Sequence, residues 1–213
     1  KCVITDPQGN EHKLVLPMPG RFNVANALVA LAVSELAGLP IEDALAGIAH
    51  VVVPGRLQRI DEGQDYLAIV DYAHKPAAVA AVIATLRSEI KGRLCVVLGA
   101  GGDRDASKRA IMGREAARGS DLFIVTDDNP RSEDPAVIRA AVEAGAYELP
   151  TEERGEVRNI GDRAAAIRAA IAWAEPGDAV LVAGKGHETG QNVNGVIHHF
   201  DDREEVRAAL QER

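Results

Sequence analysis

Short apolar runs alternate with longer segments of helical periodicity from residue 66 to the end of the chain. The run from Leu94 to Leu98 contains no charged residue, a pattern typical of a strand that is covered on both faces of a sheet. Residues 77–90 place Val79, Val82 and Leu86 on one stripe, which predicts a helix. Similar patterns predict strands at 66–70, 122–125, 157–160, 179–183 and 196–200, and helices at 107–118, 135–147, 163–173 and from 202 onwards. Strands that alternate with helices predict an α/β fold with a Rossmann-like, doubly wound and mostly parallel sheet.

Acidic residues mark the expected starts of three of these helices. Asp134 stands before Pro135, the usual order of an N-cap and a first helical residue. Asp162 is expected to cap the next helix, and Asp201 with Glu204 is expected to open the last one as a capping pair.

Residues 1–53 have a different pattern. A strand is expected at 12–16, and it is followed by a Pro-Met-Pro-Gly breaker. Residues 24–36 are apolar nearly all the way round, which predicts a buried helix, and a shorter helix follows at 41–49. Because this segment has no earlier partner, we interpret it as the end of a domain whose beginning precedes Lys1. The expected boundary lies at Pro54-Gly55, which gives domains at 1–53 and 54–213.

Composition excludes several classes of protein. The 213 residues are 46% hydrophobic and 26% charged, which is enough apolar material for a core. The net charge of −8 argues against a nucleic-acid or membrane partner, since such partners require a basic surface. Two cysteines, Cys2 and Cys95, form neither a disulfide framework nor a zinc spacing, so no metal-ligating residue is predicted in the chain. No signal peptide or membrane span is visible, and a cytoplasmic location is expected.

Polar loops follow four of the predicted strands, at 71–76, 99–105, 126–131 and 184–188. Because ligands of open α/β sheets bind beyond the carboxyl ends of the strands, we expect these loops to form one site.

The glycine-rich loop at 99–105 does not complete a dinucleotide fingerprint. The third glycine that this motif requires is replaced by Arg104. A plain strand-to-helix turn therefore stays open as an interpretation, although a guanidinium on such a loop is suited to binding a carboxylate.

The loop at 126–131 suits an amino acid. Asp128, Asn129 and Arg131 flank a stiffening proline, and together they offer an acceptor for an ammonium group and a planar donor for a carboxylate. Glu188 would supply a second ammonium acceptor, while Gly184 would allow close backbone approach. The alternative is an ordinary surface loop that leads to the Asp134 cap. For the neighbouring Lys185 and His187, loop solvation and a structural role are the preferred interpretations.

Six motifs, in order, resemble those of the Mur ligase family, in particular the ligases that add meso-diaminopimelate. They cover nearly the whole chain: Gly20 to Asn26, Gly55-Arg56, Asp71 to His74, Gly101 to Asp105, Asp128 to Arg131, and Gly184 to Glu188.

The resemblance implies roles for eleven residues. Arg104, Asp128, Asn129, Arg131, Gly184 and Glu188 match the positions that hold diaminopimelate. Residues near ATP in the family are matched by Asn23, Asn26, Arg56, Asp71 and His74. For the two asparagines, helix capping or inter-domain hydrogen bonding remains an alternative. Lys75 and Ala77 depart from the residues of many relatives, which leaves the finer ATP contacts open.

The implied reaction is ATP-driven amide synthesis through an acyl phosphate, with Mg²⁺ neutralising the transferring phosphoryl group. The partner substrate would be UDP-N-acetylmuramoyl-L-alanyl-D-glutamate, bound by domains upstream of Lys1. No Gly-x-x-x-x-Gly-Lys phosphate loop occurs in the 213 residues, so the chain is expected to fold but not to turn over alone, and the catalytic residues stay unassigned. Alternatives are a lysine-adding Mur ligase, a folylpolyglutamate synthetase, a nucleotide-binding oxidoreductase and a non-catalytic amino-acid-binding module.

Overall fold

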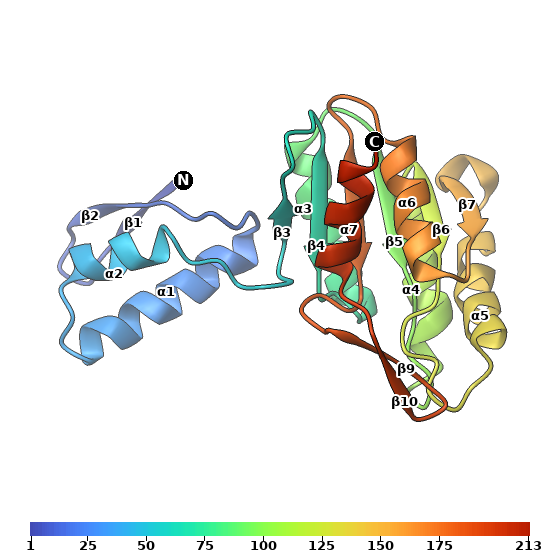
Figure 1. The fold of residues 1–213 in the computed structure, drawn as a ribbon. Coiled ribbons are helices and arrows are strands. Elements are labelled where there is room, and N and C mark those ends of the chain that lie inside the picture. Colours follow the sequence, from blue (N-terminus) through green and yellow to red (C-terminus); the bar gives the residue numbers. More distant parts are fainter. The chain divides into compact units, whose positions relative to one another are not determined.

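The computed structural model describes residues 1–213, which form two compact units, Lys1–Val53 and Pro54–Arg213 (Figure 1). Assigning the first unit to the end of an ATP-binding domain stays a prediction. No helix in either unit is both long enough and apolar enough to cross a membrane.

The first unit packs a hairpin against two helices. Its elements are β1 (Cys2–Thr5), β2 (Glu11–Leu14), α1 (Arg21–Leu36) and α2 (Ile41–Ile48). A small core forms around Leu14, Ala27 and Leu31. The helix predicted at residues 24–36 is confirmed, but the prediction that it is buried is wrong for most of its surface. Val29 and Leu36, for example, are exposed. The hairpin and α2 cover only one face of α1. The other faces of this helix are apolar but are not buried within the unit.

The second unit is built on a six-stranded sheet with the order β3-β4-β8-β5-β6-β7. All neighbouring strands are parallel except β3, which pairs antiparallel to β4. The strands are β3 (Gln58–Ile60), β4 (Leu67–Asp71), β5 (Leu94–Leu98), β6 (Leu122–Val125), β7 (Glu156–Asn159) and β8 (Ala179–Ala183). The helices are α3 (Pro76–Glu89), α4 (Lys108–Gly119), α5 (Pro135–Tyr147), α6 (Arg163–Trp173) and α7 (Asp202–Gln211), with a short 3-10 turn η1 (Thr151–Glu153). The predicted mostly parallel α/β sheet is confirmed.

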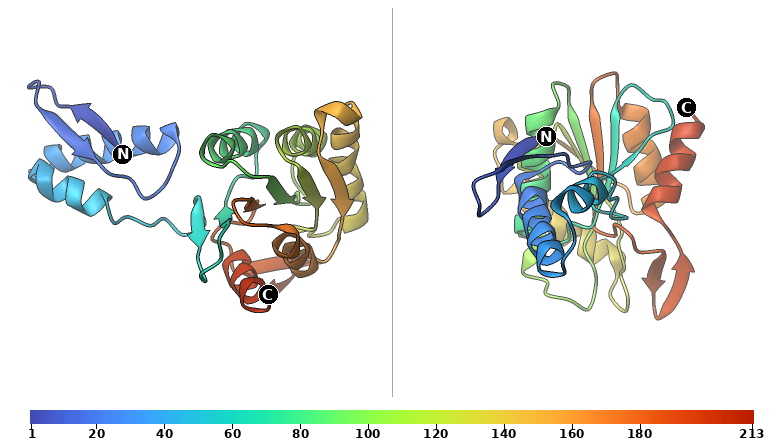
Figure 2. Two further views of the ribbon diagram at one scale, coloured as in Figure 1. Left: turned by 90° about the horizontal axis from the view of Figure 1, so that it is seen from above. Right: turned by 90° about the vertical axis from the view of Figure 1, so that its left-hand side faces the viewer.

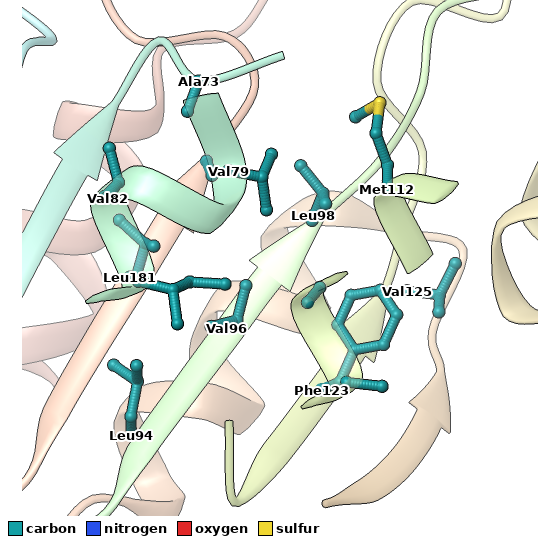
Figure 3. Packing of buried hydrophobic residues seen from close by; sticks show 14 of the residues in the cluster. Ala73, Val79, Val82, Leu94, Val96, Leu98, Met112, Phe123, Val125 and Leu181 are labelled. Atoms are coloured by element: carbon teal, nitrogen blue, oxygen red, sulfur yellow. The ribbon is translucent and has the colours of Figure 1, made fainter. Parts of the chain in front are cut away.

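Helices cover both faces of the sheet, so the fold is doubly wound. α3, α4 and α5 lie on one face and α6 and α7 on the other (Figure 2). In β5, Leu94, Val96 and Leu98 enter the first core, whereas Cys95 and Val97 enter the second. Figure 3 shows the first set beside side chains of the neighbouring strands and helices. This double burial explains why the strand has no polar position.

Two of the three predicted caps form as expected. The Asp134 carboxylate accepts from the Ala136 N–H, and the Asp162 carboxylate accepts from the Ala165 N–H. At the last helix Asp201 also acts as a cap, but Glu204 does not complete the predicted pair. Its carboxylate lies 2.6 Å from His199 Nε2, because the preceding strand brings an imidazole within reach.

Residues 196–200 were predicted as a strand of the main sheet, and this prediction is wrong about the strand with which they pair. They form β10 (Val196–His199), which pairs antiparallel with β9 (Gly190–Val193) in a ribbon separate from the main sheet. Asn194 and Gly195 join the two strands with positive φ angles of 51° and 81°, the conformation of a tight hairpin turn.

Candidate functional site

The four polar loops meet at one edge of the sheet, as the sequence predicts. They follow β4, β8, β5 and β6, which are neighbours in that order and run parallel. Their carboxyl ends therefore lie side by side, and the loops converge there (Figure 1).

Glycines allow the loop after β8 to lie close to its neighbours. A Cβ at Gly55 would overlap the backbone of Gly186, and a Cβ at Gly186 would lie 2.6 Å from the Cβ of Tyr72. Gly184 has a φ of +116°, and a Cβ there would lie 2.8 Å from Asp128 Oδ2. Side chains at these positions would force the loops apart.

The loops after β5 and β6 are tied together by both backbone and side chains. The Gly102 N–H donates to the Asn129 carbonyl at 2.9 Å, and Arg131 Nη1 donates to the Gly102 carbonyl at 2.7 Å. Below them, buried Arg109 forms an ion pair with Glu133 at 2.8 Å. Arg131 itself adopts a φ of 52°, which its position between the tied loops holds in place.

Asp128, Asn129 and Glu188 gather around an ammonium group that belongs to the chain itself. Lys185 is fully buried, and its Nζ lies 3.9 Å from Asp128 Oδ1 and 3.5 Å from Glu188 Oε2. It also lies 3.3 Å from Asn129 Oδ1, while Asn129 Nδ2 donates to Glu188 Oε2 at 3.0 Å. The ribbon joins this cluster, because the Asn192 N–H donates to Asn129 Oδ1 at 2.9 Å.

A second buried cation lies beneath the cluster. Arg163 makes two hydrogen bonds to Asp202, at 2.7 and 2.8 Å, and both side chains are fully buried. It also donates to the carbonyls of Ala183 and Asp127, the residues that lead into two of the loops. Burial by itself would lower the pKa of Arg163, but the carboxylates of Asp202, Asp128 and Glu188 together raise it. The guanidinium therefore stays charged inside the fold.

Four of the six predicted diaminopimelate residues, Asp128, Asn129, Gly184 and Glu188, are thus brought together. Of the two arginines, Arg131 turns toward the Gly102 carbonyl, and Arg104 is exposed on the loop after β5.

Three of the five predicted nucleotide residues lie around Tyr72. The guanidinium of Arg56 lies 4.6 Å from the centre of the Tyr72 ring. The His74 ring lies 4.6 Å from the same ring, and its Nδ1 donates to the Tyr72 carbonyl. Asp71 turns inward, where its carboxylate accepts from the N–H groups of Leu57 and Ala73 at 2.7 Å, and burial raises its pKa.

Asn23 and Asn26 lie in the first unit, on α1. Asn23 Nδ2 donates to the Pro19 carbonyl at 2.7 Å, and Asn26 Nδ2 lies 3.5 Å from Asn23 Oδ1. This bond joins the first turn of α1 to Pro19, the residue before the N-cap Gly20, and no side-chain hydrogen bond caps the start of the helix. The roles proposed for the two asparagines therefore stay predictions.

Sequence reasoning missed three residues of this edge: Lys185, Arg163 and Tyr72. For Lys185 a signal existed in the sequence, because the backbone of a lysine only two residues beyond a fully apolar strand lies close to the core. His187, whose ring lies 5.1 Å from Tyr72, adds to the aromatic group.

Comparison with known proteins identifies the family. Residues 55–186 match the family model "Mur ligase, glutamate ligase domain". The chain is 60% identical over 212 residues to the UDP-N-acetylmuramoyl-L-alanyl-D-glutamate–2,6-diaminopimelate ligase of Corynebacterium glutamicum, covering 99% of this chain and 41% of that protein. The ligase of the same name from Streptomyces coelicolor is 52% identical over 208 residues, covering 97% of this chain and 41% of that protein. The chain therefore spans about two fifths of the length of these relatives.

Solved structures agree. A structure of a UDP-N-acetylmuramoyl-L-alanyl-D-glutamate–2,6-diaminopimelate ligase matches with a TM-score of 0.71 and 38% identity, covering 99% of this chain and 42% of that chain. A Mycobacterium tuberculosis folylpolyglutamate synthase complexed with ADP and AMPPCP matches with a TM-score of 0.62 and 26% identity, over 83% of this chain and 40% of that chain. On the match of its residues 55–186, which are more than half of its length, the chain belongs to the Mur ligase family.

Proposed function

We propose that this chain supplies the amino-acid site of an ATP-dependent amide ligase that joins meso-diaminopimelate to UDP-N-acetylmuramoyl-L-alanyl-D-glutamate in peptidoglycan synthesis. The observation that carries the proposal is the cluster of Asp128, Asn129 and Glu188 at the carboxyl edge of the sheet. The relatives at 60% and 52% identity carry the name of this reaction, which supports the choice of substrate.

Charge in the cluster favours a cationic group. The cluster holds the carboxylates of Asp128 and Glu188 against the single cation of Lys185, and the ion pair of Arg163 and Asp202 beneath it adds no net charge. The excess of one negative charge suits one ammonium group of a bound amino acid, which would restore neutrality in a poorly solvated site.

Arg104 and Arg131 would bind the carboxylate of the same end of the substrate. A guanidinium offers two parallel donors to a carboxylate, which fixes its orientation as well as its charge. L-Lysine lacks a carboxylate at its distal end, so it would leave these donors unpaired and bind more weakly. With one end held in this way, the other amine would be free to attack the activated glutamyl group.

The nucleotide would be bound only in part by these residues. Arg56 and His74 lie against the Tyr72 ring, and Asp71 orders the neighbouring backbone. These three residues are proposed to contribute to the ATP site, as are Asn23 and Asn26. No group of three or more His, Cys, Asp or Glu side chains in residues 1–213 could hold a metal ion. We therefore assign these residues to substrate binding and orientation.

Calorimetric titration of the chain with meso-diaminopimelate, and separately with L-lysine, tests the proposal. We expect saturable binding of meso-diaminopimelate and weaker binding of L-lysine. Arg104→Ala changes an exposed side chain and Arg131→Lys keeps the charge but removes the planar donor, so both should weaken binding at least about tenfold. Arg118→Ala, an exposed change on α4, is the matched control. Equal affinity for both amino acids, or no effect of either arginine variant, would overturn the proposal.

A further inference from the structure

Lys185 is a fully buried lysine that the proposed function does not use. It lies two residues beyond the end of β8, after Gly184, where the loop begins. A buried ammonium group is costly unless its donors are paired. Here the Nζ donates to the Gly190 carbonyl at 2.6 Å and has Asn129, Glu188 and Asp128 as further acceptors.

Each contact fixes a different part of the site. The bond to Gly190 holds the first residue of β9, and so the start of the ribbon. The contact with Asn129 Oδ1 orients that amide, because two donors on its oxygen leave its NH₂ group facing Glu188. The third contact restrains the carboxylate of Glu188, which is itself partly exposed.

We propose that Lys185 is a positioning residue of the amino-acid site, which holds Asn129, Glu188 and the ribbon in the arrangement that receives the substrate ammonium. This inference rests on the proposed function. Lys185 is not a contact of the substrate, because its side chain is fully buried and its Nζ is surrounded by acceptors of the protein.

Whether removing the Lys185 ammonium group weakens or strengthens substrate binding distinguishes a positioning role from a purely electrostatic one. If Lys185 acted only as a nearby positive charge, its removal would strengthen the attraction of the cluster for an ammonium group. If it positions the acceptors, its removal frees Glu188 and Asn129, and binding weakens. Loss of one well-placed hydrogen bond to a charged ligand group weakens binding by about tenfold or more.

Lys185→Met keeps most of the volume of the side chain and removes its donors. The matched control is Lys91→Met, the same change at an exposed lysine in the turn before β5, at the opposite edge of the sheet. In titrations with meso-diaminopimelate we expect Lys185→Met to weaken binding at least about tenfold and Lys91→Met to leave it unchanged. Equal or tighter binding by Lys185→Met would overturn the inference.

Amide hydrogen exchange gives a second readout without ligand. The Asn192 N–H donates to Asn129 Oδ1, and the Arg131 N–H donates to the Asn192 carbonyl. In Lys185→Met both amides should exchange at least about tenfold faster, while amides of β5 keep their protection and show that the domain is folded. Unchanged exchange at Asn192 and Arg131 would refute positioning, whatever the affinity.

The two proposals can fail separately. If the unchanged chain does not bind meso-diaminopimelate, the proposed function fails and the assignment of Lys185 to an amino-acid site fails with it. If the unchanged chain binds and Lys185→Met binds equally well, only the role of Lys185 is wrong.

Discussion

The buried pair of Arg163 and Asp202 offers the sharpest test of how the second unit is held together. Both side chains are fully buried, and two hydrogen bonds of 2.7 and 2.8 Å join them. Asp202→Asn removes the negative charge at almost constant volume. It leaves the guanidinium buried without a carboxylate partner, so that its acceptors are the uncharged amide oxygen of the substituted side chain and the carbonyls of Ala183 and Asp127.

The expected loss follows from the uncompensated charge. Breaking a buried ion pair by removing one partner costs about 3–5 kcal/mol. With a urea m-value of about 2 kcal/mol/M, the unfolding midpoint should fall by about 1.5–2.5 M. The matched control is Asp61→Asn, because its partner Arg59 and Asp61 itself are each 53% exposed. That exposed pair should contribute no more than about 1 kcal/mol, most of it screened by solvent.

Urea unfolding followed by circular dichroism measures both variants. The double variant Arg163→Met with Asp202→Leu completes the test, since replacing both charges with apolar groups removes the uncompensated charge and should recover much of the stability. A loss below about 1 kcal/mol for Asp202→Asn, or a double variant no better than the single one, would refute the reasoning.

Two further predictions concern packing and titration. A Cβ at Gly145 of α5 would fall on the Ala110 carbonyl of α4, so Gly145→Ala should destabilise the second unit by about 1–3 kcal/mol in urea unfolding, whereas Gly47→Ala in α2, which has open space, should not destabilise. The hydrogen bond that His199 Nε2 donates to the Glu204 carboxylate raises the pKa of His199 above its ordinary 6.5, so the pair's small stabilising effect is fully present below pH 6.5 and is lost as pH rises through the raised pKa. NMR titration of the His199 ring should show this, and Glu204→Gln should return the pKa toward 6.5; an unaltered pKa in the variant would contradict the pairing.

The sequence predicted the part of the fold that apolar patterning controls. The strands β4, β5, β6 and β8 are buried on both faces, and their continuous apolar runs made them visible. β3 was missed because an edge strand of three residues with an exposed arginine carries no such pattern. The same limit applies elsewhere, since strands that pair only through their backbone leave little trace in composition.

The ribbon shows this limit at the site itself. The sequence of β9 is Gly-Gln-Asn-Val, which no hydrophobic pattern marks as a strand. Its position depends on hydrogen bonds between distant segments, such as that from Gln191 Nε2 to the Asp128 carbonyl. The Asn194-Gly195 turn signal was present in the sequence, and it would have indicated a hairpin ending in residues 196–199.

The position of the site on the sheet could be predicted from the sequence, but the contacts between its side chains could not. The convergence of four polar loops followed from the parallel strands alone. That Lys185 is buried among Asp128, Asn129 and Glu188 depends on how the β8 loop folds back over the sheet edge. In the sequence, Lys185 and His187 look alike, as polar residues of a glycine-rich loop, yet one is fully buried and the other exposed.

The ammonium acceptors and the arginines of the proposed amino-acid site differ in how firmly the fold holds them. This difference decides which arginine contributes more to selectivity for meso-diaminopimelate over L-lysine. Asp128 and Asn129 are buried, and the Asn129 side chain is held by hydrogen bonds before any ligand binds, while Gln191 Nε2 donates to the Asp128 carbonyl. Both residues therefore lose little entropy on binding. Arg104 is exposed, and ordering such a side chain costs about 0.5–1.5 kcal/mol. Arg131 is held by the hydrogen bond from its N–H to the Asn192 carbonyl and by the bond from its Nη1 to the Gly102 carbonyl. Its side chain therefore loses less conformational entropy on binding. Under the proposed function, discrimination between meso-diaminopimelate and L-lysine should therefore depend more on Arg131 than on Arg104.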